Sequence, residues 1–406
     1  MNTPKYDAAI IGGGPAGAAA AITLARRGLS VVVLDRAVFP RDKLCGGLLT
    51  LRSRRIFDAA FGSAHWDDLV EGTAHGARFF HGTEPLASVD HRQPLALANR
   101  RDFDAALLHF AERAGAESRQ GVRVQRVEFT NFTALRLRLS NGGEEITARA
   151  VVGADGVSSA AARSLFGRAF RRRDLALAVE MEVPLDWPSP RNQAIRRPAI
   201  HFGVASRGYG WRFPKRNGTT VGVGGLWRKN PEMAGQFRQF LREWYGEVPP
   251  FPIQGHFLPA GNFRLRPGRG PILLAGDAAG LVDPITGEGI ALAMESGAMA
   301  GRAAADALAA GKPHTALARY RPEYRTIAQS LLAARILTFL ARPEWGQALL
   351  FEKLKGPSGE WLVPANPRRS GPANLCPESD GDGSAISPLP AHRRGHGRRP
   401  ASRPHP

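Results

Sequence analysis

One segment near the start of the chain constrains its fold more than any other: YDAAIIGGGPAGAAAAITLARRGLSVVVLDR, residues 6–36. An apolar run is followed by Gly12, Gly14 and Gly17 in the spacing G-x-G-x-x-G, then by an alanine-rich helical stretch and a β-branched run that ends at Asp35. A strand, a glycine turn, a helix and a parallel strand in this order form the context in which the motif binds a dinucleotide. We therefore predict a dinucleotide site here.

The residue types fit that ligand. Gly12 permits the tight turn, Gly14 lets the backbone approach a pyrophosphate, and Gly17 lets the helix pack closely on the sheet. The free N–H groups and the dipole at the helix N-terminus favour an anion. Asp35 is placed to accept hydrogen bonds from an adenosine ribose.

Composition limits the class of protein. With 406 residues, 43% of them hydrophobic, the chain is long enough for one large or two ordinary domains. No apolar run approaches the roughly 18 residues of a membrane span, and the first residues lead into the predicted strand without a signal-peptide pattern. Cys45 and Cys376 are the only cysteines and offer no disulfide framework or zinc spacing. We expect a soluble, cytoplasmic protein without a metal site.

The net charge of +19 limits the partners. A basic surface suits nucleic acid, an anionic membrane or a phosphorylated substrate. Because no nucleic-acid motif or aromatic stacking platform accompanies the charge, we do not expect a nucleic-acid partner.

The alternation of predicted strands and helices is interrupted at residues 175–262 and resumes from residue 271. Residues 175–262 alternate strand-like runs with Pro- and Gly-rich turns, as in a mostly antiparallel sheet. From residue 271 a buried strand, Ile272–Ala275, is followed by Asp277, and Gly289 leads into a long helix. A site at the carboxyl end of a strand and beside a helix N-terminus suits a ligand in an open α/β sheet.

Two further stretches allow alternative interpretations. The small residues Cys45-Gly46-Gly47 let the backbone lie close to a planar ligand, but Cys45 alone is better explained as a small buried hydrophobic residue. In GYGWRFPK, Tyr209, Trp211 and Phe213 alternate and would share one face of a strand, which by itself predicts a core aromatic stripe.

The last part of the chain divides into a helical segment, residues 321–355, and a tail, residues 356–406. An apolar stripe of Tyr324, Ile327, Leu331, Ile336 and Phe339 predicts that the helix docks on the body or lies on a membrane. The tail is rich in Pro and Arg and has no apolar period, so we predict that it is disordered. Its abrupt onset also fits a shift of the reading frame, which translation of the other frames would reveal.

Six motifs occur in an order and spacing typical of one family: IIGGGPAG, DR…KLCGG, NRRDFDAAL, GADG, YGWRFPK and GDAAGLVDPITGEGI. Over residues 6–340 the chain resembles the FAD-dependent geranylgeranyl reductase family. That family belongs to a larger flavoprotein group with the p-hydroxybenzoate hydroxylase-like monooxygenases and the flavin halogenases.

The resemblance implies a set of FAD contacts. They are Gly12, Gly14, Ala16 and Gly17 at the pyrophosphate, Asp35 at the adenosine ribose, Arg100 at a phosphate, the backbone of Val124 at adenine, Asp277 at the ribityl chain, Gly289 and Ile290 at the pyrimidine edge, and Cys45 and Gly46 beside the isoalloxazine. Arg36 is a further expected cofactor contact. The resemblance also reverses the interpretation of Cys45, Tyr209 and Trp211, which it implies are catalytic residues around a lipid pocket over the flavin.

Departures from the neighbouring families favour the reductases. Gly280 follows Asp277-Ala278-Ala279 where aromatic hydroxylases of this fold usually carry His, and Ile290 stands where their loop has Asn. Tyr209 and Phe213 replace the Trp and Ile of the halogenase motif. No second G-x-G-x-x-G follows a strand, so we expect NADPH to bind transiently or a separate electron carrier to reduce the flavin.

We therefore predict an α/β protein with a discontinuous, Rossmann-like FAD-binding domain of the glutathione-reductase type and an interleaved, mostly antiparallel substrate domain. The FAD-binding domain would comprise residues 1–75, 100–165 and 265–320, and the substrate domain residues 76–99 and 166–264. The expected reaction is reduction of C=C bonds in a prenyl lipid or prenyl diphosphate. We also expect the protein to contact a membrane surface or an electron-donor protein. One alternative is a FAD-dependent monooxygenase or halogenase that acts on a small aromatic or natural-product substrate. A second is a catalytically silent FAD-binding or membrane-associated protein.

Since the tail offers no face to bury, we predict that truncation after Leu354 leaves folding and FAD content intact. Thermal unfolding and the absorbance of bound flavin measure both. A sharp drop in melting temperature would show instead that the tail is packed.

Overall fold

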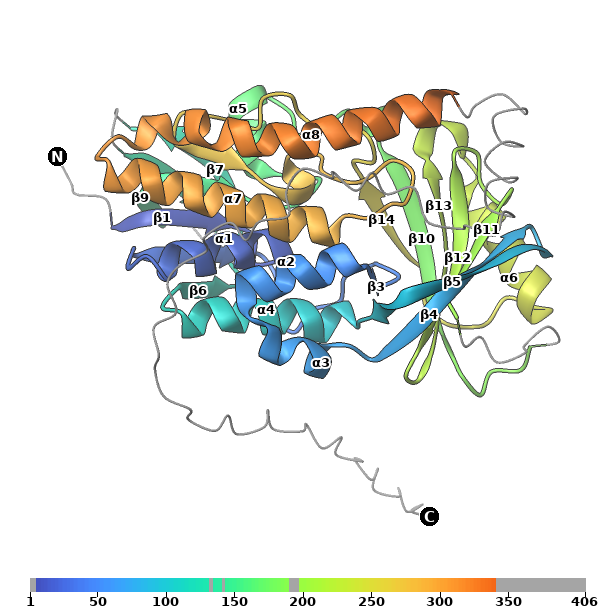
Figure 1. Ribbon diagram of the computed structural model, residues 1–406. Helices are drawn as coiled ribbons and strands as arrows, with labels where there is room; N and C mark the ends of the chain where they lie inside the picture. Colours follow the sequence, from blue (N-terminus) through green and yellow to red (C-terminus); the bar gives the residue numbers. More distant parts are fainter. Residues whose placement is uncertain (1–4, 131–133, 141–142, 190–196, 341–406) are drawn as a thin grey trace, which may run out of the picture. The chain divides into compact units, whose positions relative to one another are not determined.

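The computed structural model describes residues 5–130, 134–140, 143–189 and 197–340, all within one compact unit of the chain. Its helices and strands are arranged about two sheets of eight strands each (Figure 1). The predicted tail, residues 356–406, lies outside the described residues.

The first sheet contains the predicted glycine-turn segment. Its strands are β1 (Tyr6–Ile11), β2 (Val31–Asp35), β6 (Glu117–Gln120), β7 (Val124–Phe129), β8 (Leu135–Leu139), β9 (Glu145–Gly153), β15 (Gly268–Arg269) and β16 (Ile272–Leu274). Strands β16, β9, β1, β2 and β6 run parallel in this order. Their carboxyl ends therefore meet at one edge, where β1, β2 and β16 are followed by the predicted site residues.

The second sheet is mostly antiparallel and runs in the order β14, β10, β13, β12, β11, β4, β5, β3. Its strands are β3 (Leu48–Leu49), β4 (Gly72–His81), β5 (Glu84–Leu97), β10 (Ala176–Pro184), β11 (Ala199–Phe202), β12 (Gly208–Lys215), β13 (Gly218–Leu226) and β14 (Gln254–Leu258). Strands β4 and β11 form its parallel pair. The α/β class with a second, mostly antiparallel sheet agrees with the prediction. The residue limits of the two domains stay a prediction, and β3 and the start of β4 join the second sheet from within residues 1–75.

Eight α-helices lie in the described part of the chain: α1 (Pro15–Ala25), α2 (Leu51–Phe61), α3 (Trp66–Leu69), α4 (Arg100–Arg113), α5 (Ala160–Phe166), α6 (Met233–Tyr245), α7 (Ile290–Ala309) and α8 (Ala316–Leu340). None of the described helices is long and apolar enough to cross a membrane.

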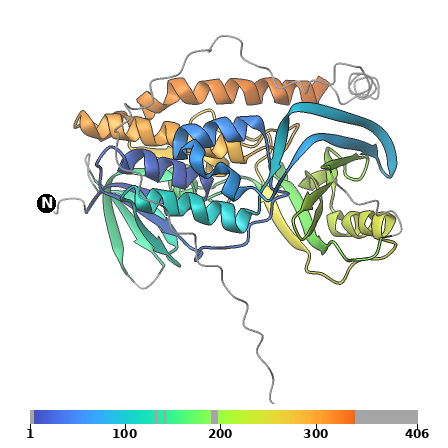
Figure 2. The ribbon, with the colours of Figure 1, turned by 60° about the horizontal axis from the view of Figure 1, so that its bottom comes forward.

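Each sheet has its own hydrophobic core. Strand β1 and helix α1 are almost wholly buried in the core of the first sheet. Helix α6 covers one face of the second sheet with Phe237, Phe240 and Leu241 (Figure 2). The opposite face carries Trp211 and Phe213 in a separate cluster. The two faces of the second sheet therefore have different neighbours.

The predicted apolar stripe on helix α8 is buried only in part. Tyr324, Ile327 and Leu331 are buried, and the Tyr324 hydroxyl donates a hydrogen bond to the carbonyl of Arg264 at 2.7 Å. Ile336 is 51% exposed because the end of α8 extends beyond the core that covers its first turns. The side chain of Phe339 lies outside the described residues.

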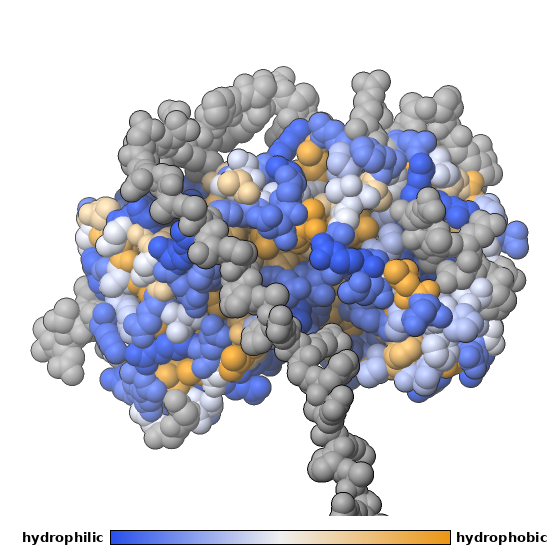
Figure 3. Space-filling model, turned by 90° about the horizontal axis from the view of Figure 1, so that it is seen from below, coloured by the Kyte–Doolittle hydropathy of each residue, from blue (hydrophilic) through white to orange (hydrophobic). Residues whose placement is uncertain are grey.

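On the face seen in Figure 3, much of the visible surface is hydrophilic and hydrophobic patches lie between.

The contact between α1 and α7 depends on residues that have no side chain. A Cβ on Gly297 of α7 would collide with the carbonyl oxygen of Ala16, whereas a Cβ on Gly235 of α6 would meet nothing. We predict that Gly297→Ala lowers the free energy of unfolding by about 1–3 kcal/mol, since α7 must move away from α1. The matched control Gly235→Ala should raise it by about 0.5–1 kcal/mol. Urea unfolding measures both, and a Gly297→Ala protein as stable as the wild type would contradict the packing described here.

Candidate active site

The turn after β1 has no space for side chains. Gly12 has a φ of +100°, and a Cβ on it would collide with the carbonyl of Ala154, which follows β9. A Cβ on Gly17 would collide with the carbonyl of Gly12. Gly14 precedes α1 without any side-chain cap, so the first N–H groups of α1 remain available to a ligand.

Asp35 ends β2 beside this turn. Its two carboxylate oxygens accept hydrogen bonds from the backbone N–H of Gly13 at 2.7 Å and of Ala37 at 2.8 Å. Each oxygen can accept a further bond, for example from a ribose hydroxyl. The next residue, Arg36, is exposed.

Arg41 supplies a positive charge at the N-terminus of α1. Its Nη2 lies 3.4 Å from the position of a Cβ on Gly14 and donates to Oδ2 of Asp104 at 3.0 Å. Its Nη1 is buried and has no hydrogen-bond partner among the described residues. A guanidinium with an unpartnered N–H next to a helix N-terminus forms an anion site that suits a diphosphate.

Arg100 is engaged with the same carboxylate. At the first position of α4, its Nε and Nη2 each bind an oxygen of Asp104 at 2.7 Å, and the Asp104 side chain is fully buried. Burial alone would lower the pKa of Arg100, but the charges of Asp104 and then Cys45 outweigh it, so the pKa is raised. The structure thus gives Arg100 a protein partner, and its contact with a phosphate stays a prediction.

Further charged groups converge on this region. Burial raises the pKa of Asp277, and the charges of Lys43 and Arg100 oppose that rise. Burial lowers the pKa of Lys43, and the charge of Asp277 is the largest effect that opposes this. Burial lowers the pKa of His256 in β14 to about 3, and a group of surrounding cations adds to this: Lys43, Arg36, Arg100 and Arg41. The site is therefore rich in positive charge and able to hold a polyanion.

The N-terminus of α7 forms another side of the site. The helix begins at Ile290 after Gly289, with no side-chain cap, and Oδ1 of Asp277 lies 3.9 Å from the position of a Cβ on Gly289. The preceding residue, Glu288, accepts a hydrogen bond from the Thr50 hydroxyl at 2.5 Å. This bond fixes the loop before α7 to the start of α2.

The predicted catalytic residues come together where the two sheets meet. Gly46 lies against β12, because a Cβ on it would be 2.5 Å from Cδ2 of Phe213 and 3.3 Å from Cδ1 of Trp211. The rings of Tyr209 and Trp211 are edge to face, with centroids 6.1 Å apart. Burial raises the pKa of Tyr209. These contacts bring Cys45, Gly46, Tyr209 and Trp211 into one site.

Two hydrogen bonds fix the parts of this site. The Tyr209 hydroxyl donates to the carbonyl of Thr286 at 2.6 Å, which ties β12 to the loop before α7. The N–H of Gly47 donates to Sγ of Cys45 at 3.4 Å.

Val124 is the predicted site residue that lies apart from these contacts. It is buried in β7 opposite Leu139. Two residues earlier, the backbone N–H of Val122 donates a hydrogen bond to the carbonyl of Asp35 at 2.8 Å. The contact of Val124 with adenine stays a prediction.

Sequence reasoning missed Glu180 of β10. Its Oε1 accepts a hydrogen bond from the backbone N–H of Cys45 at 2.7 Å, and the residue is 6% exposed. In LALAVEMEV the acids alternate with apolar residues, a pattern that normally assigns them to solvent. An acid within an otherwise apolar strand was the available signal, but the pattern alone cannot tell that another part of the chain covers this face.

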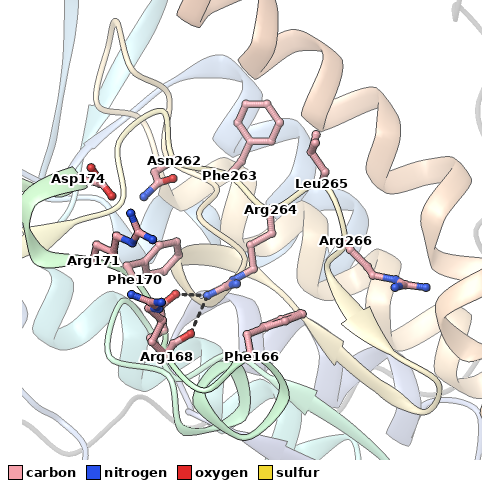
Figure 4. A pocket seen from close by; sticks show the side chains of 11 residues that line it. Phe166, Arg168, Phe170, Arg171, Asp174, Asn262, Phe263, Arg264, Leu265 and Arg266 are labelled. Carbon is pink, nitrogen blue, oxygen red and sulfur yellow. Dashed lines mark hydrogen bonds between the residues drawn. The ribbon is translucent and has the colours of Figure 1, made fainter.

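A separate basic groove lies at the loop before β15 (Figure 4). Its lining residues are Phe166, Arg168, Ala169, Phe170, Arg171, Asp174, Asn262, Phe263, Arg264, Leu265 and Arg266. The guanidinium of Arg264 lies between the rings of Phe166 and Phe170 and donates to the carbonyl of Ala169. None of the predicted site residues lines this groove, so it is distinct from the candidate site.

Within the described residues, no group of three or more His, Cys, Asp and Glu side chains could hold a metal ion.

Known proteins resemble this chain in both sequence and fold. A family profile described as "FAD binding domain" matches residues 5–196. The chain is 31% identical over 316 residues to a geranylgeranyl diphosphate reductase of Rhodobacter capsulatus, an alignment that covers 76% of this chain and 77% of that protein. It is 32% identical over 344 residues to digeranylgeranylglycerophospholipid reductase 2 of Methanothermobacter thermautotrophicus, covering 79% and 83%.

A solved structure has the same architecture. The geranylgeranyl bacteriochlorophyll reductase-like protein of Thermoplasma acidophilum superposes with a TM-score of 0.70 at 22% identity, covering 81% of this chain and 87% of that one. This superposition confirms the predicted fold class.

The residues at the first sheet fit FAD. The turn at Gly12 and Gly17 is closed to side chains, and Nη1 of Arg41 lacks a partner among the described residues at the point where a diphosphate would lie. Asp35 retains acceptor capacity for a ribose. The structure therefore provides candidate partners for the diphosphate and for the adenosine ribose of FAD.

We predict that Arg41→Ala weakens FAD binding about 10- to 150-fold, because a hydrogen bond to a charged group contributes about 1.5–3 kcal/mol. Asp104 keeps both bonds to Arg100 in this variant, so the fold should persist. The matched control is Arg101→Ala, which removes an exposed guanidinium paired with Asp42. Flavin fluorescence during titration of the apoprotein gives the dissociation constants. Equal affinity of the Arg41 variant and the wild type would contradict the assignment.

Proposed function

Because the chain belongs to the FAD-dependent geranylgeranyl reductase family of oxidoreductases, we propose that it reduces isolated C=C bonds in the prenyl chain of a diphosphate or lipid. Two relatives are named for such substrates, a geranylgeranyl diphosphate and a digeranylgeranylglycerophospholipid. Both substrates combine an apolar chain with an anionic head group.

One observation carries the proposal: Gly46, from the loop after β2, packs against an apolar aromatic wall on β12. Trp211 and Phe213 are 8% and 7% exposed and form part of a hydrophobic cluster with Leu44. An apolar wall beside the flavin site suits an alkene, because it can hold the chain by burial and exclude water.

Bound FAD, once reduced, supplies the hydride for the reaction. The protein would position it through the diphosphate site at Arg41 and the N-terminus of α7. Free N–H groups at Gly289 and Ile290 would stabilise negative charge on the pyrimidine edge of the flavin. Tyr209 and Trp211 would hold the alkene against the flavin face, since hydride transfer needs near-contact geometry.

Electron supply and location complete the proposal. The sequence has one G-x-G-x-x-G after a strand, so NADPH would bind transiently or a separate electron-donor protein would reduce the flavin. We place the protein in the cytoplasm, and its net charge of +19 supports contact with an anionic membrane surface, where prenyl lipids reside.

We predict that the anaerobically reduced wild type is reoxidised by geranylgeranyl diphosphate, with the return of oxidised-flavin absorbance in a stopped-flow instrument. Trp211→Ala should keep its FAD and slow this step by about 10²-fold, because a loosely held alkene loses the transfer geometry. The control Trp227→Ala removes a Trp that packs on Phe257, outside the cluster of Trp211, and should react at the wild-type rate.

A different result would favour the alternative enzyme class. Reduced enzyme that ignores prenyl substrates but consumes oxygen to hydroxylate or halogenate an aromatic compound would overturn the reductase proposal.

A further inference from the structure

Glu180 is a buried acid at the centre of the candidate site. It lies on the face of β10 that is opposite helix α6, and it binds the backbone N–H of Cys45 through Oε1. Its Oε2 is buried and has no hydrogen-bond partner in the part of the chain that the structure describes. A buried carboxyl oxygen without a hydrogen-bond partner costs free energy, and a catalytic role is one reason for a protein to keep such a group.

Glu180 and Trp211 flank the same glycine of β13. Glu180 pairs with Gly222 across the sheet, and Gly222 pairs with Trp211. A Cβ on Gly222 would collide with the indole, which therefore leans across this glycine toward β10. Nε1 of Trp211 is also buried and unpartnered among the described residues. Glu180 thus shares the space beside Cys45 with the aromatic wall.

The surroundings of Glu180 allow it to hold a proton at neutral pH. Burial raises the pKa of Glu180 to about 7. The hydrogen bond from the N–H of Cys45 lowers this pKa, as do the charges of Lys215 and Lys43, whereas the charge of Glu182 raises it. An acid with a pKa near the working pH can both release a proton and regain it.

We propose that Glu180 supplies the proton that accompanies hydride transfer to the substrate double bond; this inference rests on the proposed function. The carboxylic acid of Glu180 would give a proton to one alkene carbon, while the other would receive the hydride that reduced FAD supplies. Two C–H bonds would replace the π bond, the flavin would lose two electrons, and Glu180 would be left as a carboxylate.

The same strand provides a route by which Glu180 regains its proton. Glu182 lies two residues further along β10 on the same face and is exposed, and its Oε1 accepts a hydrogen bond from the Thr220 hydroxyl at 2.6 Å. Lys215 on β12 interacts with both carboxylates and donates to the carbonyl of Ala98 at 2.7 Å. Glu182 and Lys215 would carry protons between water and Glu180.

Glu180→Gln separates this role from a purely structural one, since the amide oxygen can still accept the Cys45 N–H but the side chain holds no acidic proton. In wild type, reoxidation of the reduced enzyme by geranylgeranyl diphosphate should slow as the pH rises through about 7. The Gln variant should keep its FAD, react roughly 10²-fold more slowly at low pH, and lose the pH dependence. The matched control Glu182→Gln should show a much smaller loss.

Infrared spectroscopy of the oxidised FAD-loaded protein tests the same group without turnover. The C=O stretch of a protonated buried carboxyl should disappear as the pH rises through about 7 in wild type. In Glu182→Gln it should disappear at a lower pH, because the charge of Glu182 no longer raises the pKa of Glu180, and it should be absent from Glu180→Gln. If Glu180→Gln fails to load FAD, Glu180→Asp should restore loading with the titrating band shifted.

The outcomes are distinguishable. Wild-type enzyme that is reoxidised by substrate while Glu180→Gln reacts at the same rate overturns the role of Glu180 and leaves the proposed function intact. Wild-type enzyme that no prenyl substrate reoxidises overturns the proposed function and this role with it. A titrating band that survives in Glu180→Gln shows that the proton resides elsewhere.

Discussion

The structure depends on a backbone contact that excludes side chains, the approach of the β1–α1 turn to the end of β9. Gly12 and Gly17 leave no space for a Cβ, and the carbonyl of Ile11 binds the N–H of Ala154 at 2.8 Å. Because this contact fixes the start of α1, it also fixes where the helix dipole points. Arg41 adds its charge at that point, and Gly297 lets α7 pack against Ala16 at the start of the same helix. The diphosphate site is thus a consequence of close packing.

The second sheet completes the site through a few long-range contacts. Cys45 binds Glu180 of β10, Tyr209 of β12 binds the loop before α7, and Thr50 holds Glu288 of that loop. These bonds join segments far apart in the sequence around the space between the α7 N-terminus and the aromatic wall. A prenyl chain buried there would meet apolar rings on one side and the flavin on the other. The cations near Lys43 and Arg41 account for the positive charge of the cofactor side.

Local patterns in the sequence predicted the parts of the fold that depend on local chemistry. The glycine turn, the buried strands β1 and β16 and the helix from Ile290 were predicted because period and turn residues are encoded within each segment. Glu180 could not be predicted, because the alternation of β10 is the same whether the second face meets water or another part of the chain. The sharing of Asp104 by Arg41 and Arg100 joins residues 63 positions apart, and Ile336 is exposed because a helical period does not tell where the underlying core ends. The site roles of Val124 and Arg100 came from resemblance, and the structure gives both residues other partners.

The central claim is that this site adds hydrogen to a prenyl double bond, and product analysis in heavy water tests it most directly. The reduced, oxygen-free enzyme would be mixed with excess geranylgeranyl diphosphate in D₂O and the products analysed by mass spectrometry. We predict a product in which one double bond has gained a pair of deuterium atoms on adjacent carbons, in an amount equal to the flavin oxidised. Unchanged substrate with the flavin still reduced, or flavin oxidised without any deuterated prenyl product, would contradict the account.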